Sequence, residues 1–524
     1  MSRSQNIRNN LIFNVLKFVI QLVLQFVLRT CLIYYLGIEY LGLDGLFTNV
    51  FSFLNLAELG IGTAIVFNMY KPIAEKNIEK VKSLQSLYKK FYVLIAIVVA
   101  TMGIIIAPFI PKLISGEVRA DVNIYILFFM YLIYTLMGYF SAQKRSVLFA
   151  YQRNDIENRV KIICVIISTI LQILMVILTK NYYVYFSILI VFSLIECVLI
   201  KLATDKMFPE LKGPAKKLDK ETKQNLFKGM TAVSMHKISN VVVFSTDQIL
   251  ISTFLGITVL GAYSNYYMII ASIFSVFMII FNSLSASAGD LMVNQTKEYV
   301  YDRFKQINVI FSFLSAFCTI CLICLFQPFI KIWTGGGIYL LDFSTVIIIC
   351  ISFYFSRMRQ GVLVFKEAGG YYSQDKWRTI LEVISNLFFS IILVKLIGIN
   401  GIFLGTIISS LLGPFITEPR VLYKYYFKKP VSGYYKRYII DFIITALVGS
   451  IMYFIISFIP DGGIWLLIAK FLVCVPLCTI LLIVAFLPIK EFKEVLYMAK
   501  SWIKSFLNRK RNSKIFEMED KDEQ

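Results

Sequence analysis

The chain contains many apolar stretches of about 20 residues, each long enough to cross a lipid bilayer as an α-helix. Hydrophobic residues make up 58% of the 524 residues, whereas soluble globular domains are about 45–50% apolar. Short polar connections separate the apolar stretches. This pattern predicts an all-α polytopic membrane protein.

The apolar stretches predict 14 transmembrane helices. They lie at 11–36, 41–69, 91–114, 122–142, 160–179, 184–203, 230–255, 259–288, 306–332, 343–366, 379–397, 401–421, 439–459 and 464–487. We expect an N-terminal six-helix bundle over 1–203, a cytoplasmic linker over 204–229, a second six-helix bundle over 230–421, transmembrane helices 13 and 14 within 422–487, and a cytoplasmic amphipathic helix with an acidic tail over 488–524.

Lysine and arginine gather in alternate connections between the predicted spans. The basic connections lie at 71–90, 144–161, 201–228 and 424–437, and the segment after 488 is basic as well. Because cytoplasmic loops carry the excess of basic residues, both termini are predicted to lie in the cytoplasm. The net charge of +21 is therefore spread along a membrane protein, and it does not indicate a nucleic-acid partner.

Four polar side chains share one face of the first predicted span. Lys17, Gln21, Gln25 and Arg29 recur at intervals of four residues, so they form a stripe along the helix. Hydrocarbon does not solvate such a stripe, which therefore indicates water or a polar cargo beside the helix. For Lys17 and Arg29, interaction with the lipid headgroups is an alternative to a polar interior, because long side chains near a helix end can extend to the headgroups. The two glutamines straddle the midplane and are too short for this.

Further polar side chains lie within other predicted spans. The candidate substrate-binding residues are Lys17, Gln21, Gln25, Arg29, Asn55, Lys237, Asn240, Arg357 and Arg359. The candidates for ion coupling or gating are Asp44, Glu58, Asp247 and Glu382. Intramembrane carboxylates carry protons or neutralise nearby cations, so salt bridges remain an alternative for Glu58 and Asp247. For Arg357 and Arg359, anchoring at the lipid headgroups remains an alternative role. For Glu382, the alternative role is helix capping.

A seven-residue motif occurs twice. Leu36–Gly42 reads LGIEYLG, and residues 255–261 read LGITVLG, with Gly37 and Gly256 separated by 219 residues. Each copy joins an outward-going span to its return partner, and six spans separate the copies. The two halves are therefore predicted to be parallel repeats, an architecture in which transporters bind cargo between the halves.

The sequence contains no motif for catalysis or for a cofactor. It has no P-loop and only 1 histidine, so neither an ATPase site nor a zinc site is predicted. Cys318, Cys321 and Cys324 lie in an apolar span, where packing is favoured over metal binding. The predicted outer connections are short, which argues against a polysaccharide polymerase or ligase with an outer catalytic domain.

Two stretches resemble Wzx-type flippases of polysaccharide repeat units, which belong to the multidrug/oligosaccharidyl-lipid/polysaccharide exporter superfamily. They are YYLGIEYLGLDGLFTNVFSFLNLAELGIGTAIVFNMYKPIAE (Tyr34 to Glu75) and FKEAGGYYSQDKWRTILEVISNLFFSIILVKLIGINGIFLGTIIS (Phe365 to Ser409). The resemblance implies two six-helix bundles and a final helix pair. It also implies a cationic lumen, to which Lys17, Arg29 and Lys237 are assigned by position and facing.

The resemblance implies a function in the bacterial plasma membrane. The expected cargo is an undecaprenyl-pyrophosphate-linked oligosaccharide, moved outward by alternating access for assembly of capsule, exopolysaccharide or an O-antigen-like polymer. No cofactor is expected, and the cycle is expected to couple to a proton, a sodium ion or the membrane potential. Expected partners are membrane lipids and the polymerase and glycosyltransferases of the same pathway. The alternatives are a lipid II flippase, a multidrug exporter, a membrane polymerase or ligase, or a non-transporting scaffold.

Overall fold

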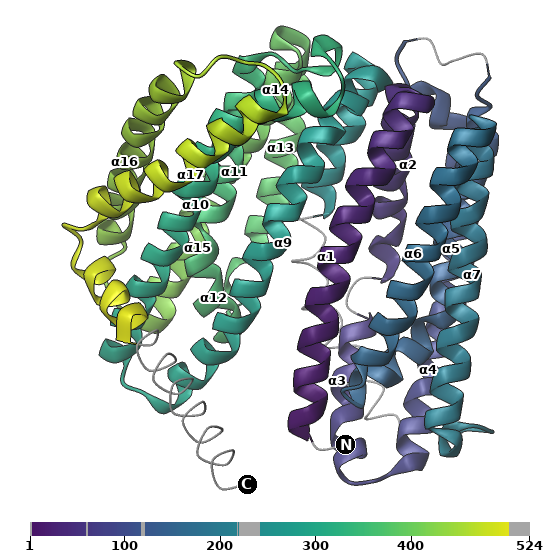
Figure 1. Ribbon diagram of the computed structural model, residues 1–524. Helices are drawn as coiled ribbons and strands as arrows, with labels where there is room; N and C mark the ends of the chain where they lie inside the picture. The colour runs from purple at the N-terminus through teal and green to yellow at the C-terminus, as the bar shows by residue number, and fades with distance from the viewer. Residues whose placement is uncertain are drawn as a thin grey trace, which may run out of the picture. The chain divides into compact units, whose positions relative to one another are not determined.

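The structure is a computed structural model that describes residues 3–58, 61–116, 121–216, 218, 241–371 and 373–501. The secondary structure of these residues is entirely helical (Figure 1). Twelve helices in the described ranges are long and apolar enough to cross a membrane. The chain is therefore a multi-pass helical membrane protein.

The 12 candidate spans coincide with 12 of the 14 predicted ones. The predicted span 41–69 is interrupted in the structure by the 3-10 turn η1 (Asn55–Glu58), which separates α2 (Ile38–Leu54) from α3 (Ile61–Ala74). Of the predicted span 230–255, the structure describes only the apolar helix Val241–Leu255. The total of 14 spans thus remains a prediction.

The chain forms two compact units that interleave in sequence. Unit 1 comprises Met1–Ser272, Trp333–Leu341 and Lys376–Gly413, and unit 2 comprises Ile273–Ile332, Asp342–Asp375 and Pro414–Gln524. The predicted division into two six-helix bundles is a different partition, and it remains a prediction.

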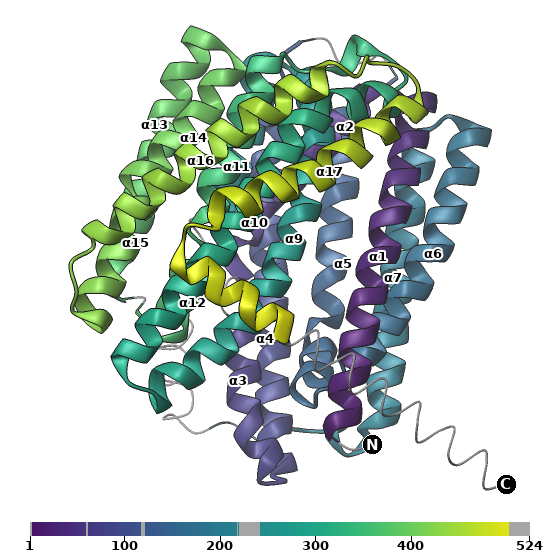
Figure 2. The same cartoon turned by 60° about the vertical axis from the view of Figure 1, so that its left-hand side comes forward.

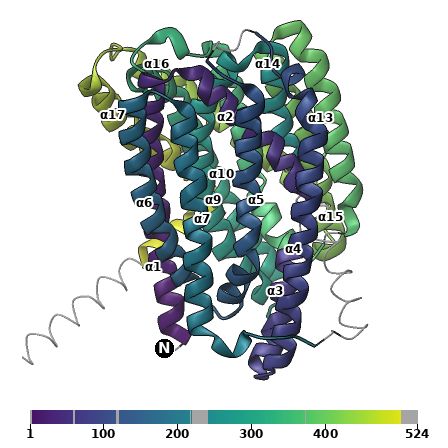
Figure 3. The same cartoon turned by 90° about the vertical axis from the view of Figure 1, so that its right-hand side faces the viewer.

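Unit 1 contains a group of long helices packed side by side. They are α1 (Arg3–Tyr35), α4 (Ile78–Ile106), α5 (Ile124–Ala150), α6 (Asn154–Thr179) and α7 (Tyr182–Met207), followed by the short η3 (Pro209–Leu211). The helix α6 contacts both α1 and α7, and α5 contacts α4 and α7 (Figure 3). The turn η2 (Ala107–Leu113) continues α4. Asn123 and Asn181 accept hydrogen bonds from the first backbone amides of α5 and α7, which is favourable N-capping.

The helices α13 (Lys376–Ile397) and α14 (Ile399–Leu412) form a tight pair within unit 1 (Figure 2). Gly398 joins them with φ +62°. A Cβ atom on Gly401 would overlap the Leu393 carbonyl, and one on Gly405 would overlap Ser390. These glycines therefore allow the two backbones to approach closely, which brings polar residues of both helices together.

The two copies of the repeated motif fold alike and touch each other within unit 1. Gly37 and Gly256 have φ values of +103° and +98°, and their amides donate to the Leu32 and Ile251 carbonyls at 3.0 and 3.1 Å. A Cβ atom on Gly42 would overlap the Ile257 carbonyl, and one on Gly261 would overlap the Ile38 carbonyl. We call this reciprocal approach the glycine contact.

Unit 2 is built from the second part of α9 (Ile257–Asn294) and the helices that follow it. These are α10 (Lys297–Trp333), α11 (Phe343–Met358), α12 (Gln360–Ala368), η5 (Ser373–Asp375), α15 (Pro414–Val421), the π-helical η6 (Leu422–Phe427), α16 (Ser432–Ser457) and α17 (Ile464–Phe486). The last residue of α10, Trp333, and the turn η4 (Gly337–Tyr339) belong to unit 1. Pro414 follows the break at Gly413, so the predicted span 401–421 is divided between α14 and α15.

Residues 490–501, within the predicted C-terminal amphipathic segment, are helical. Phe492 is buried against Phe313 of α10 and Phe486 of α17. Glu491 forms an ion pair with Lys305 of α10 at 3.4 Å. This part of the helix is therefore anchored on unit 2 itself, and residues 502–524 lie outside the described ranges.

Candidate functional site

The N-terminal half of the α1 stripe forms a polar seam with α6. The Lys17 Nζ donates to Asn158 Oδ1 at 2.9 Å, and Asn158 Nδ2 donates to Asn14 Oδ1 at 2.9 Å. One turn earlier, Asn10 Oδ1 accepts from the backbone amide of Asp155 at 2.8 Å. The Lys17 ammonium is therefore held against α6 by a neutral amide.

The middle of the stripe has a different character. Gln21 is half-buried and Gln25 is exposed. Within the described part of the chain, neither side chain forms a hydrogen bond. These two amides are therefore able to bind water or a polar cargo without breaking an existing contact.

Arg29 closes the stripe at its other end. Its Nε donates to Asn265 Oδ1 of α9 at 2.7 Å, and its guanidinium also donates to Ser264 Oγ. The next residue, Thr30, accepts from Trp333 Nε1 at 2.7 Å. Both ends of the stripe thus bind neighbouring helices of unit 1 through neutral groups.

A pair of buried tyrosines lies beside the carboxylate of Asp44 in α2. The Tyr131 hydroxyl donates to Asp44, and it lies 2.9 Å from the hydroxyl of Tyr182. Tyr131 and Tyr182 are both buried. The Asp44 side chain therefore has a neutral hydrogen-bond donor, Tyr131.

A second tyrosine cluster surrounds the interruption between α2 and α3. The Tyr92 hydroxyl donates to Glu58, and the Tyr139 hydroxyl donates to Asn55. The Tyr88 hydroxyl lies 2.8 Å from the position of a Cβ atom on Gly62. Discontinuous helices place polar groups at the midplane of many transporters, and this one presents a carboxylate and an amide.

Asp247 lies among oxygen-bearing side chains of α13 and α14. The Thr406 hydroxyl lies 3.0 and 2.8 Å from the two carboxylate oxygens of Asp247. Asn386 Nδ2 donates to the same hydroxyl at 2.9 Å. Asp247, Thr406 and Asn386 are all buried. A carboxylate, a hydroxyl, an amide and the nearby Ile402 carbonyl are ligand types that suit a hard cation.

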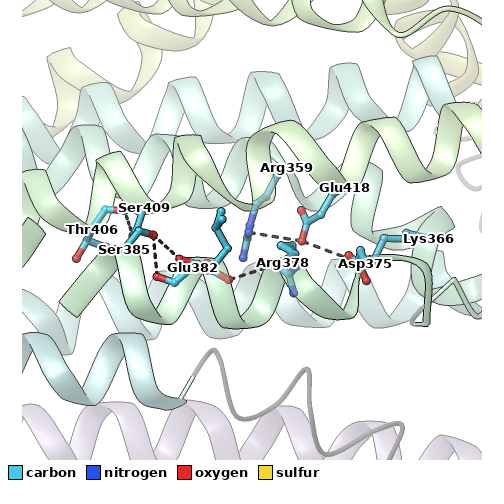
Figure 4. A network of polar contacts seen from close by, with 10 residues as sticks. Arg359, Lys366, Asp375, Arg378, Glu382, Ser385, Thr406, Ser409 and Glu418 are labelled. Carbon is cyan, nitrogen blue, oxygen red and sulfur yellow. Dashed lines mark hydrogen bonds and ion pairs between the residues drawn. The ribbon is translucent and has the colours of Figure 1, made fainter. Parts of the chain in front are cut away.

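Glu382, one turn before Asn386 on α13, has a cationic partner. The Arg378 guanidinium lies 3.4 Å from Glu382 Oε2, and both side chains are buried (Figure 4). The Ser385 hydroxyl donates to the Glu382 backbone carbonyl. Glu382 thus differs from Asp247 in that an ion pair within its own helix neutralises it.

Unit 2 contains a buried ionic cluster that the sequence did not predict. Lys366 pairs with Asp375 and lies 3.9 Å from Glu418, which in turn lies 3.5 Å from the Arg359 guanidinium (Figure 4). Lys366, Asp375 and Glu418 are each no more than 4% exposed. We call these four residues the α12–α15 ion cluster. The two positive and the two negative charges of the cluster compensate each other.

The predicted arginines of the tenth span are thus engaged within unit 2. Arg359 belongs to the ion cluster, and Arg357 is 5% exposed, with its guanidinium carbon 4.0 Å from the centre of the Phe274 ring. Two further predicted residues, Lys237 and Asn240, lie outside the described ranges.

Four residues of these clusters were not predicted as site residues from the sequence: Thr406, Lys366, Asp375 and Glu418. Glu418 lies within the predicted span 401–421, where a carboxylate is costly without a partner, and that position was an available signal. Lys366 and Asp375 flank a predicted connection, where charges are ordinary, so the sequence carries no sign of their burial.

Several solved structures share this fold. A structure described as lipid II flippase MurJ in an inward closed conformation matches with a TM-score of 0.62 and 15% identity, over 91% of this chain and 98% of that one. An inward-facing multidrug resistance MATE transporter matches with a TM-score of 0.59 and 13% identity, over 77% of this chain and 94% of that one. A point mutant of the MATE transporter VcmN of Vibrio cholerae matches with a TM-score of 0.55 and 13% identity, over 81% of this chain and 99% of that one.

No curated protein matches the chain in sequence. The family model described as polysaccharide biosynthesis protein matches residues 7–285, which is just over half of the chain. This range includes the α1 stripe, both copies of the glycine motif and Asp247. The chain therefore belongs to the polysaccharide biosynthesis protein family, which confirms its resemblance to the Wzx-type flippases.

Proposed function

We propose that the protein is a flippase that moves undecaprenyl-pyrophosphate-linked oligosaccharide repeat units from the inner to the outer leaflet of the bacterial plasma membrane. Membership of the polysaccharide biosynthesis family supports this proposal, as does the fold shared with a lipid II flippase and with MATE transporters. The α1 stripe is the observation that carries it. Its cationic ends have neutral partners, and its central glutamines have none in the described part of the chain.

The stripe suits the chemistry of such a cargo. Lysine and arginine neutralise a diphosphate, and arginine binds its oxygens with a planar set of donors. Amides such as those of Gln21 and Gln25 bind sugar hydroxyls. The lipid tail remains in the bilayer during transfer, and alternating access exposes the stripe to each side in turn. An exporter of cationic drugs is favoured less, because it requires an anionic lining.

Two energy sources are available to the cycle. Outward movement of negative charge is favourable in a cell with a negative interior, by about 2.3 kcal/mol per charge per 100 mV. A proton or sodium ion bound at Asp247 then resets the empty carrier. The Thr406 hydroxyl beside Asp247 supports this assignment, and Asn386 Nδ2 donates to that hydroxyl. Asp44 and Glu58 are secondary candidates, whereas Glu382 is neutralised by Arg378.

A lipid II flippase is the second candidate function, favoured by the similarity to MurJ. Lipid II carries the same lipid diphosphate, so the α1 stripe fits either cargo. The family match favours polysaccharide repeat units, whose further partners are the polymerase and glycosyltransferases of capsule, exopolysaccharide or O-antigen-like polymer assembly. Enzymatic chemistry has no part in the proposal, and both termini are assigned to the cytoplasm from the loop charges.

Deletion of the gene in its native host tests the proposal. We expect surface polysaccharide to be lost and lipid-linked oligosaccharide to accumulate in the inner leaflet, where an impermeant sugar-oxidising reagent does not reach it in intact cells. The wild-type gene restores export. If deletion instead blocks outward movement of lipid II, or only increases sensitivity to cationic drugs, the polysaccharide assignment is wrong.

A further inference from the structure

Arg29 is connected directly to the glycine contact. The guanidinium donates to Ser264 Oγ, and the Ser264 hydroxyl donates to the Gly261 carbonyl at 2.7 Å. Gly261 is the residue on which a Cβ atom would overlap the Ile38 carbonyl. A continuous chain of contacts therefore runs from the cationic end of the stripe to the point where the two motif copies touch.

Both partners of Arg29 on α9 are neutral. Among the described residues, the guanidinium forms no ion pair, and Asp44 acts on it only over a longer distance. Hydrogen bonds between a guanidinium and an anionic oxygen are stronger than those with an amide or a hydroxyl. A phosphate oxygen near Arg29 is therefore able to displace Ser264 and Asn265.

Asn265 adds a second feature that favours an anion. Arginine only donates hydrogen bonds, so the Asn265 atom that faces it is the amide oxygen. The remaining amide nitrogen, Nδ2, is fully buried and has no hydrogen-bond partner in the described part of the chain. A buried donor without a partner is costly. An anionic oxygen beside Arg29 would satisfy this donor together with the guanidinium.

We propose that Arg29 is the release point of the glycine contact. While Arg29 binds Ser264 and Asn265, it holds α9 against the α1–α2 turn. A diphosphate takes over the guanidinium and the Asn265 amide, which frees Ser264 and allows the two motif copies to separate. The inference rests on the proposed function, because it requires an anionic cargo, and it adds that the cargo itself triggers opening at this end of unit 1.

A disulfide reporter measures whether the contact is closed. The position of a Cβ atom on Gly45 of α2 lies 3.6 Å from Leu260 Cγ, and Leu260 directly precedes Gly261 in the second motif copy. The pair Gly45→Cys and Leu260→Cys therefore brings two thiols together across the contact between α2 and the second motif copy. Oxidation of the full-length protein in vesicles, followed by mass spectrometry, gives the yield of the linked peptides.

The probes are undecaprenyl pyrophosphate and inorganic pyrophosphate, with the uncharged undecaprenol as control. We expect a diphosphate to lower the disulfide yield at least threefold and undecaprenol to leave it unchanged. A response to the lipid alone assigns the trigger to the lipid carrier, whereas a response to both assigns it to the diphosphate group. No response to either diphosphate, or an equal response to undecaprenol, overturns the proposal.

Asn265→Asp provides the sharpest second test. The new carboxylate pairs with Arg29, so the yield is expected to stay high with either diphosphate and export to fall at least tenfold. Asn294→Asp, the same change at an exposed position of α9, is the matched control and should respond like the wild type. If Asn265→Asp also responds like the wild type, Arg29 is not the release point. The gene-deletion experiment tests the identity of the cargo separately. If deletion does not block polysaccharide export, the proposed cargo is wrong, whatever the disulfide reporter shows.

Discussion

The charges of the α12–α15 ion cluster and those of Arg29 and Asp247 in unit 1 are satisfied in different ways. In the cluster, Lys366 lies between Asp375 and Glu418, so each charge has an opposite charge beside it. In unit 1, Arg29 binds a serine and an asparagine, and Asp247 binds a threonine. A charge in a buried ion pair is already neutralised, so an incoming ion gains little by replacing its partner. A charge with only neutral hydrogen-bond partners binds an ion or an anionic cargo more strongly than it binds those partners.

This difference separates structural charges from functional ones. Removal of one member of a buried ion pair leaves an uncompensated charge, which typically destabilises a protein by about 3–5 kcal/mol. Replacement of a charge that has neutral partners leaves partners that can still hydrogen-bond to one another. Substitutions in the ion cluster are therefore expected to affect the amount of folded protein, and substitutions of Arg29 or Asp247 to affect transport.

The largest effect is expected for Lys366→Met. This change removes the cation that pairs with buried Asp375, and Arg359 then carries the one positive charge of the four-residue cluster. We expect the protein level in the membrane to fall several-fold and the unfolding temperature in detergent to drop. Lys490→Met is the matched control, because Lys490 is 86% exposed and pairs with Glu494 only at 3.9 Å. Equal levels and unfolding temperatures in the two variants would contradict a structural role for the cluster.

Asp247→Asn is expected to have the next largest effect. The new amide still hydrogen-bonds to Thr406, so the protein level should remain near that of the wild type. Without the carboxylate the proposed coupling ion is not bound, and export per molecule should fall at least tenfold. Asp290→Asn, at an exposed position of α9, is the control. Export at the wild-type rate in the Asp247 variant would show that Asp247 does not bind the coupling ion.

The sequence predicted the fold well because each span carries its own signal. An apolar stretch of about 20 residues becomes a helix in a membrane wherever its neighbours lie. The interruption at Asn55–Glu58 was not predicted, because apolar residues continue through it. The division of the span 401–421 at Gly413 was not predicted either, although Pro414 indicates where a helix stops.

The partners of the site residues were less predictable than their positions. The four-residue spacing placed Lys17 and Arg29 on one face of a helix, but it carried no information about Asn158 or Asn265 on other helices. The ion cluster joins residues separated by up to 59 positions, from Arg359 to Glu418. Such pairings depend on tertiary packing, which local periodicity does not encode.

A smaller effect is expected for the double change Gln21→Leu and Gln25→Leu. These amides form no hydrogen bond within the described part of the chain, so their loss should not destabilise the protein. If they bind the sugars of the cargo, export per molecule should fall about three- to tenfold, since one hydrogen bond contributes about 0.5–1.5 kcal/mol. The control is Val19→Leu with Val23→Leu, on an exposed face of the same helix. Equal export by the two double variants would exclude the glutamines from cargo binding.

Lys17→Gln is expected to have the smallest effect, and it tests whether the inner end of the stripe acts through its charge. A glutamine can still donate to Asn158, which also keeps its bond to Asn14, so the seam with α6 and the protein level should persist. The lost charge weakens attraction of a diphosphate at the inner end, and export should fall about two- to threefold. Because salt screens such an attraction, the deficit relative to the wild type should narrow in vesicles as ionic strength rises. Lys71→Gln, at a surface pair with Glu75, should export normally. A deficit that is independent of salt would mean that Lys17 serves only to join α1 to α6.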